Sequence, residues 1–181
     1  MKNQKKAYIF ALLAVLFWSS IATAFTLALK EMDAYQLLFG ATLVSFICLF
    51  IILVFTKKLS FIYSLKKADI LHSALLGLLN PFLYYVILLK AYKILPAQEA
   101  MALNYIWPIT LVLLSIPVLK QKISTRGIIA IIISFIGVLI IATQGKLLNF
   151  AFTNLYGDLL ALGSSIVWAL FWIFNVNDKR D

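Results

Sequence analysis

The chain has 181 residues, of which 64% are hydrophobic and only 13% are charged, and its mean hydropathy is +1.00. Soluble domains contain about 25% charged residues, and a domain of this size could not bury so much apolar surface in water. Disordered chains are poor in apolar and aromatic residues, so disorder is excluded as well. The composition predicts a protein whose solvent is the lipid bilayer.

The formal net charge is +9, from 16 basic and seven acidic residues. The basic residues form short clusters between apolar runs, without the basic face or the mixing of aromatic and basic residues typical of nucleic-acid binding. We therefore expect no nucleic-acid partner and interpret the clusters as loops of a membrane protein. The single cysteine, Cys48, lacks the partners for an intramolecular disulfide or a zinc site.

Apolar runs of about 20 residues, the length of a membrane-spanning helix, recur along the chain. The six predicted spans are Ala7–Leu29, Ala34–Phe55, Ile70–Leu89, Ala97–Leu119, Gly127–Thr143 and Leu159–Val176. None of them alternates with a period of two, which argues against a membrane β-barrel. The sequence thus predicts an all-α, polytopic membrane protein with six transmembrane helices.

Lysine and arginine are distributed unevenly over the segments between these spans. The N-terminus, the second and fourth loops and the C-terminal tail hold 12 of them, and the first, third and fifth loops hold four. The richer set is expected in the cytoplasm, together with both termini, which requires an even number of spans. A cleaved signal peptide ending at Ala22-Thr23-Ala24 is the alternative interpretation of the first run, but that run continues to Leu29.

The sixth run is similar to the first. A shift of 150 residues aligns Ala11-Leu12 with Ala161-Leu162 and Trp18 with Trp168. A second copy that starts after five spans would point the opposite way, as in transporters with inverted repeats. Residues 1–145 would then form a five-helix repeat, residues 146–156 an external loop, and residues 157–181 the first helix of a second repeat. Chance similarity of two apolar helices is the alternative.

The sequence contains no arrangement typical of an enzyme, such as a Gly-rich phosphate loop, a His/Cys/Asp cluster or G-x-S-x-G. No acidic residue lies in the middle of a run, which weakens a proton- or sodium-coupled mechanism. Glu99, about one turn into the fourth run, could pair with Lys93 or form a contact at a gate. We expect no catalysis, no cofactor and no metal.

Neutral polar and aromatic residues do occur at membrane depth, near prolines that free backbone hydrogen-bonding groups. Such residues predict the wall of a solute site, with aromatic faces for an apolar or cationic part and amide or hydroxyl groups for a polar end. Packing between helices and interfacial belts are the alternatives. The candidate site residues are Trp18, Ser19, Tyr84, Asn104, Tyr105 and Trp107.

Several short motifs are similar to those of a known family. They are Trp18-Ser19-Ser20, the stretch from Ala91 to Ala100 leading into Asn104-Tyr105-Ile106-Trp107-Pro108, and Gly157-Asp158-Leu159-Leu160-Ala161-Leu162. Over essentially its whole length the chain resembles the EamA-type permeases of the drug/metabolite transporter superfamily. The Asn-Tyr-Ile-Trp-Pro stretch resembles the branch that contains aromatic amino acid exporters.

The resemblance implies a permease of the plasma membrane, the inner membrane in bacteria, built from two inverted five-helix repeats around a central cavity. Small organic solutes such as amino acids would be exported through it by alternating access. Gln121 stands where the family carries an acid in a Leu-Gly-Glu-Arg-like motif. The chain would be C-terminally truncated, with a second copy or another chain completing the cavity. An inactive fragment of a longer permease and a non-transporting membrane scaffold are the alternatives.

Overall fold

A computed structural model describes residues 2–143, 145, 154–176 and 178 of the chain. Within these residues the chain is helical and contains no strand. Five helical segments are long and apolar enough to cross a membrane, and a sixth apolar helix is shorter. The prediction of an all-α, polytopic membrane protein is confirmed.

The first two helices match the first two predicted spans. They are α1 (Lys2–Glu31) and α2 (Ala34–Phe55), and the short α3 (Ser60–Ser64) follows them. Helix α2 begins with a capping box at Asp33, whose carboxylate accepts hydrogen bonds from the backbone N–H groups of Tyr35 and Gln36 at 2.8 and 2.9 Å. This cap fixes the sharp turn between α1 and α2.

The third predicted span is interrupted near its middle. It consists of α4 (Lys67–Gly77), the π-helical segment η1 (Leu78–Leu83) and α5 (Tyr84–Ile94). Asn80 has φ −143° and ψ 119°, an extended conformation. The ring of a following proline disfavours the helical conformation, so Pro81 explains this local kink.

The fourth predicted span is two helices, α6 (Ala97–Asn104) and α7 (Trp107–Leu119), separated by Tyr105 and Ile106. Pro108 is the second residue of α7, where the first-turn N–H groups have no partner within the helix, so its missing N–H is not needed. A proline expected inside one long helix therefore starts a new helix.

The remaining helices are α8 (Thr125–Ala142) and α9 (Leu155–Val176). Helix α8 has 18 residues, or about 27 Å of rise, slightly less than the roughly 30 Å of a bilayer core. Of the external loop predicted over residues 146–156, residues 146–153 lie outside the described part. Helix α9 begins four residues before its predicted start at Leu159.

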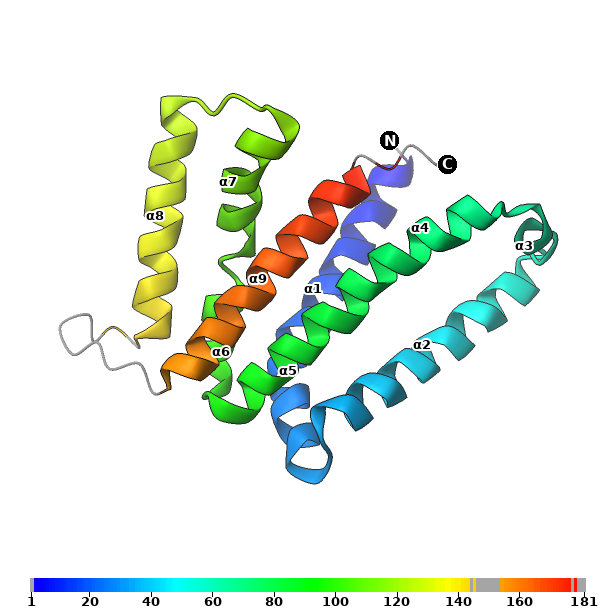
Figure 1. The fold of residues 1–181 in the computed structure, drawn as a ribbon, viewed down its shortest axis with the longest axis horizontal. Helices are drawn as coiled ribbons and strands as arrows, with labels where there is room; N and C mark the ends of the chain where they lie inside the picture. Colours follow the sequence, from blue (N-terminus) through cyan, green and yellow to red (C-terminus); the bar gives the residue numbers. More distant parts are fainter. Residues whose placement is uncertain (1, 144, 146–153, 177, 179–181) are drawn as a thin grey trace.

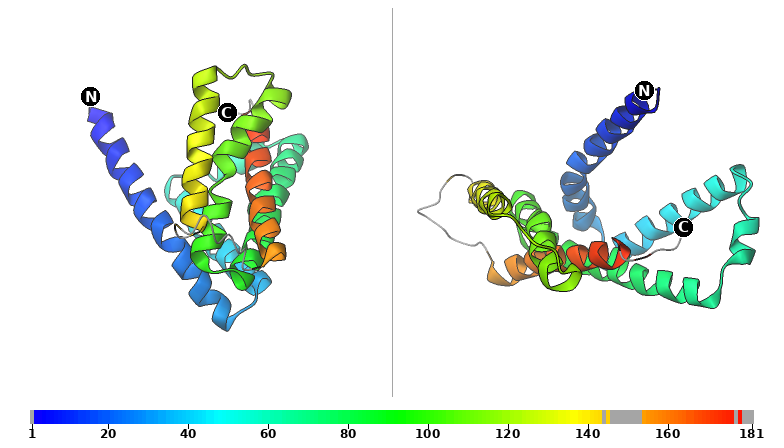
Figure 2. Two further views of the ribbon diagram at one scale, coloured as in Figure 1. Left: turned by 90° about the vertical axis from the view of Figure 1, so that its left-hand side faces the viewer. Right: turned by 90° about the horizontal axis from the view of Figure 1, so that it is seen from above.

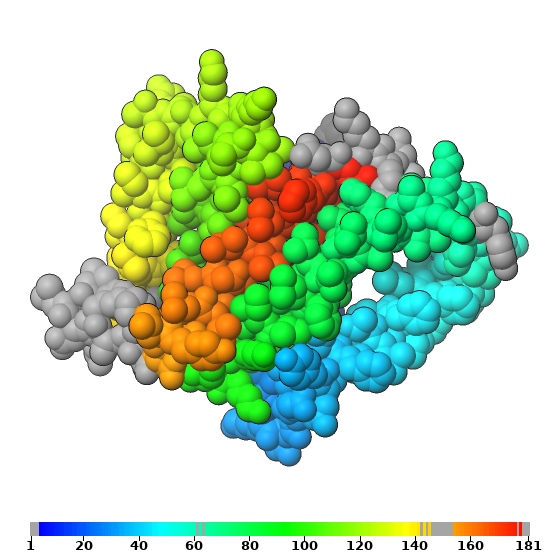
Figure 3. Space-filling model, viewed as in Figure 1, coloured from blue at the N-terminus to red at the C-terminus, as the bar shows by residue number. Residues whose placement is uncertain are grey.

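Helix α9 lies between α5 and α7 and runs antiparallel to α1, as Figure 1 shows. In the space-filling view its atoms form a continuous diagonal band between these neighbours (Figure 3). The core is gathered where the second half of α1 and the first turns of α2 meet α5, α6 and α9. The first half of α1 diverges from the other helices (Figure 2), and its apolar side chains are exposed. Such faces are stable against lipid.

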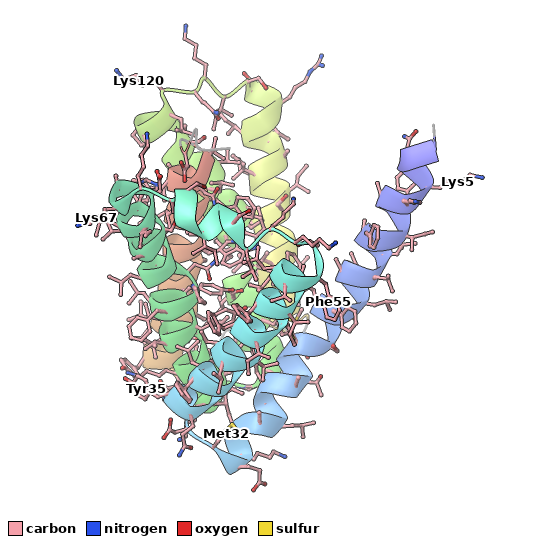
Figure 4. The ribbon with its side chains drawn as sticks, turned by 90° about the vertical axis from the view of Figure 1, so that its right-hand side faces the viewer. Lys5, Met32, Tyr35, Phe55, Lys67 and Lys120 are labelled. Atoms are coloured by element: carbon pink, nitrogen blue, oxygen red, sulfur yellow. The ribbon has the colours of Figure 1, made fainter. Side chains whose placement is uncertain are left out.

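The helices define two ends of the bundle. The first turn of α1, the last turn of α9 and the connections after α2 and α7 lie at one end, which we call the basic end (Figure 1). Lys67 and Lys120 lie there, whereas Met32 and Tyr35 lie at the opposite end (Figure 4). The turns after α1 and α5 and the start of α9 lie at that opposite end, which we call the Asp158 end.

Candidate functional site

A cavity of about 150 Å³ lies between α1, α5, the break from α6 to α7, and α9. An engineered protein cavity of about this volume holds one benzene molecule, so the space fits a single aromatic ring. Most of the lining side chains are aromatic. They are Trp18, Ile21, Phe25, Tyr84, Tyr85, Leu88, Tyr92, Asn104, Tyr105, Trp107 and Trp168.

Five of the six residues predicted for the site are brought together around this cavity. Trp18 comes from α1, Tyr84 from the start of α5, and Asn104, Tyr105 and Trp107 from the break between α6 and α7. Each of the two interrupted spans therefore contributes lining residues to the cavity next to its interruption. Non-helical backbone at membrane depth is tolerated where it lines a cavity or is buried in protein, which explains this placement.

Ser19, the sixth predicted residue, does not line the cavity. Its side chain is exposed at the surface of α1, and its hydroxyl donates a hydrogen bond to the carbonyl of Leu16 at 2.8 Å. On α1 the cavity is lined by Trp18, Ile21 and Phe25, whose spacing of three and four residues places them on one face, and Ser19 lies off that face.

The aromatic rings that line the cavity pack against one another. The ring centroids of Tyr84 and Trp168 are 4.6 Å apart, and those of Trp107 and Trp168 are 6.2 Å apart with an interplanar angle of 70°. Phe25 of α1 packs edge-to-face on Tyr85, at 5.9 Å and 87°. Such contacts stabilise aromatic pairs beyond simple area burial and hold the walls in fixed orientations.

A chain of hydrogen bonds joins three helices beside the cavity. The hydroxyl of Tyr84 donates to Oδ1 of Asn104 at 3.2 Å, and Nδ2 of Asn104 donates to the hydroxyl of Ser164 at 2.9 Å. Ser164 in turn donates to the carbonyl of Ala161. Asn104 is only 6% exposed, so its amide fixes α6 against α5 and α9 in a water-poor environment.

Trp168 is a site residue that was missed in the choice of candidates from the sequence. It lies in α9 and contacts Tyr84 and Trp107. Its indole Nε1–H is buried and has no hydrogen-bond partner in the part of the chain that the structure describes. The alignment of Trp18 with Trp168 in the shifted comparison was a signal that could have found it, because both tryptophans line the cavity.

Two of the side chains that line the cavity are largely exposed. Trp18 and Tyr105 are 54% and 42% exposed, although both contribute to its lining. The lining consists of aromatic and aliphatic side chains with the amide of Asn104. This arrangement suits binding of an apolar or aromatic group.

Comparison with known proteins identifies the family. The EamA-like transporter family matches residues 5–143, which is most of the chain. The chain belongs to the EamA-like transporter family. The family match confirms the resemblance drawn from the short motifs. It also agrees with the apolar helices that are long enough to cross a membrane.

Two relatives are described as uncharacterized transporters. One, from Archaeoglobus fulgidus, is 26% identical over 171 residues, which cover 93% of this chain and 56% of the relative. The other, from Clostridium kluyveri, is 28% identical over 180 residues, which cover 97% of this chain and 57% of the relative. The EamA-family chain thus spans little more than half the length of these curated relatives. No solved structure matches it.

Proposed function

We propose that this EamA-family chain contributes to a membrane permease for small organic solutes that carry an aromatic or apolar group, amino-acid-like solutes among them. The observation that carries the proposal is the aromatic cavity, whose volume of about 150 Å³ fits one ring. The relatives are described as transporters, and neither they nor the family suggests an enzyme.

The interrupted helices support alternating access as the mechanism. In secondary transporters, binding sites lie near the middle of the membrane at helices whose backbone is discontinuous. Here the kink at Asn80 and the break at Tyr105 and Ile106 flank the cavity. Helix α9, which would be the counterpart of α1 in a second repeat, lines the cavity together with α1 and runs in the opposite direction. Export is the direction that the sequence similarity to aromatic amino acid exporters favours.

The domain division, partner and orientation predicted from the sequence are part of the proposal. Residues 1–145 form the first repeat, residues 146–156 a connecting loop, and residues 157–181 the first helix of a second repeat. A second copy or another chain completes the cavity by covering Trp18 and Tyr105, which are exposed. The protein resides in the bacterial inner membrane with the basic end, and both termini, in the cytoplasm.

Flux into liposomes tests the proposal. The purified chain, reconstituted with a counter-solute gradient, is expected to move radiolabelled phenylalanine faster than alanine and faster than empty vesicles. Trp107→Phe removes part of the cavity wall and should lower phenylalanine flux several-fold. Trp172→Phe is the matched control, because Trp172 lies on α9 but does not line the cavity.

Each outcome has a defined meaning. Equal losses for Trp107→Phe and Trp172→Phe would attribute the effect to packing and refute the assignment of the cavity. Ring binding detected by quenching of tryptophan fluorescence, with no flux of any amino acid, would favour the alternative of an incomplete permease. Neither binding nor flux would refute the proposal and leave a membrane scaffold.

A further inference from the structure

A second hollow, separate from the aromatic cavity, is an apolar groove of about 740 Å³ between α7 and α8. Leu113 and Ile116 of α7 line one wall, and Ile128, Ile131 and Ile132 of α8 line the other. The spacing of three and four residues places each set on one face of its helix. Sites for small ligands have volumes of about 300–1,000 Å³, so the groove has the size of a ligand site.

The groove is open because the two helices that form it pack only slightly against each other. Helix α8 packs mainly against α6, and its Val138 contacts the core. Leu113, Ile128 and Ile132 are about half exposed, and β-branched side chains have few rotamers with which to fill the space between the helices. In a membrane, hydrocarbon must occupy such a groove.

The groove extends from the basic end to about the depth of one leaflet. Gln121 and Lys122, in the connection between α7 and α8, lie at its mouth. Ile132 lies eight residues after Ser124, the N-cap of α8, which is about 12 Å along the helix. Half of a bilayer core is about 15 Å. An acyl chain of the leaflet at the basic end therefore matches the groove in length, and its headgroup would lie at the mouth.

The mouth of the groove carries positive charge. Lys120, Lys122 and Arg126 fall within seven residues, and the sequence contains no acid between Glu99 and Asp158. None of these three cations forms an ion pair within the described residues. Figure 4 shows Lys120 at the basic end of the bundle. The connection between α7 and α8 is thus a site of net positive charge at the membrane surface.

The described acids lie elsewhere and do not balance this charge. Asp69 caps α4 by accepting a hydrogen bond from the backbone N–H of Lys66. Oδ2 of Asp178 lies 3.6 Å from Nε2 of His72, which also belongs to α4. The other described acids are at the Asp158 end, namely Glu31, Asp33, Glu99 and Asp158. A negative charge at the mouth must therefore come from outside the described chain.

We propose that the groove between α7 and α8 binds one anionic phospholipid from the leaflet at the basic end. The phosphate lies at Lys122, where the Gln121 amide can also donate to it, and an acyl chain lies against the isoleucines of α8. Basic pockets between membrane helices bind anionic headgroups in this way. A zwitterionic lipid would fill the groove equally well but would leave the positive charge unbalanced. The lipid site does not depend on the proposed transport.

Native mass spectrometry of the full chain in detergent micelles tests the headgroup site. Phosphatidylglycerol is the anionic probe, and phosphatidylcholine with the same acyl chains is the zwitterionic one. One phosphatidylglycerol per chain should bind several-fold more tightly than phosphatidylcholine. Lys122→Gln should weaken phosphatidylglycerol binding about fivefold, the contribution of one basic residue near an anionic lipid surface. Lys58→Gln is the matched control, because Lys58 lies in the connection after α2 at the same end and does not line the groove.

Filling the groove tests the site of the acyl chain. Ile132→Trp places a larger side chain in the groove from α8, and Leu113→Trp does so from α7. Each should lower phosphatidylglycerol binding several-fold. Ile133→Trp is the matched control, because Ile133 is adjacent, 64% exposed and not part of the lining. All three substituted side chains are exposed, so the core stays intact.

The contrary outcomes are defined as well. Equal affinity for the two lipids, or equal losses for Lys122→Gln and Lys58→Gln, would overturn the headgroup site. Binding that is unchanged in both groove-filling variants, or lowered equally by Ile133→Trp, would overturn the site of the chain. Displacement of phosphatidylglycerol by millimolar inorganic phosphate would show a phosphate site rather than a lipid site. A lipid-free dimer that Ile132→Trp dissociates and Ile133→Trp does not would show that a second copy occupies the groove, and would overturn the proposal.

Discussion

The hydrogen bond between Tyr84 and Asn104 offers a quantitative test of the site. Asn104→Ala removes the acceptor of the Tyr84 hydroxyl and the donor to Ser164, bonds of 3.2 and 2.9 Å. Interhelical side-chain hydrogen bonds in membranes contribute about 0.6 kcal/mol on average and up to about 1.7 kcal/mol. Losing two of them should lower the free energy of unfolding by about 1–3 kcal/mol.

A double-mutant cycle isolates the single bond. Tyr84→Phe removes only the hydroxyl, and Ser164 keeps its bond to the carbonyl of Ala161 in every variant. If the Tyr84–Asn104 bond forms, the two substitutions together should cost less than the sum of the single ones. The difference is expected between about 0.6 and 1.7 kcal/mol.

The assay is equilibrium unfolding of the four proteins from bicelles into a denaturing detergent, followed by tryptophan fluorescence. Ser45→Ala is the control, because Ser45 is exposed and its hydroxyl donates to the carbonyl of Ala41 on its own helix. It should change the free energy of unfolding by less than about 0.5 kcal/mol. Additive losses for Tyr84→Phe and Asn104→Ala would show that the bond does not form and would refute the reasoning.

Three further predictions concern local geometry, and thermal unfolding in detergent measures each. Gly157→Ala places a Cβ 2.7 Å from Cγ of the buried Leu95 and should destabilise by about 1–3 kcal/mol, whereas Gly163→Ala on the same helix meets nothing within 4 Å and should be neutral or stabilising. Lys120→Gly should stabilise by about 1 kcal/mol, because Lys120 is left-handed with φ 53°. Asp33→Ala removes the cap of α2 and should cost about 0.5–2 kcal/mol, whereas Asp33→Asn should retain most of it. A loss for Gly163→Ala equal to that for Gly157→Ala, a loss for Lys120→Gly, or no loss for Asp33→Ala would contradict the respective geometry.

The membrane architecture could be predicted from the sequence because it rests on length and composition alone. Apolar runs such as Ala34–Phe55 are bounded by polar residues, and the helix ends at the predicted residues. The left-handed conformation of Lys120, with φ 53°, was not predicted from the sequence. A residue in this conformation ends α7 and turns the chain toward α8.

The breaks were harder to predict. A proline near the middle of a run can kink a helix, start one, or sit in a cavity wall, and the choice depends on neighbouring helices. Pro108 starts α7, whereas Pro117 lies within α7 near its end. The sequence indicated Trp18 and Ser19 equally, but only Trp18 lies on the face of α1 that lines the cavity. Trp168 aligns with Trp18 when the sequence is shifted by 150 residues, but this similarity between the first and sixth runs was too weak to select Trp168 as a site residue.

The burial of Asp158 illustrates why distance along the chain conceals a contact. In the sequence Glu99 and Asp158 each lie at the edge of an apolar run, where an acid is expected to face water. The fold places both edges in one contact, because α9 packs against α6 in its first turns, and Gly157 lets it approach Leu95 closely. Contact between two helix starts, rather than membrane depth, removes Asp158 from water.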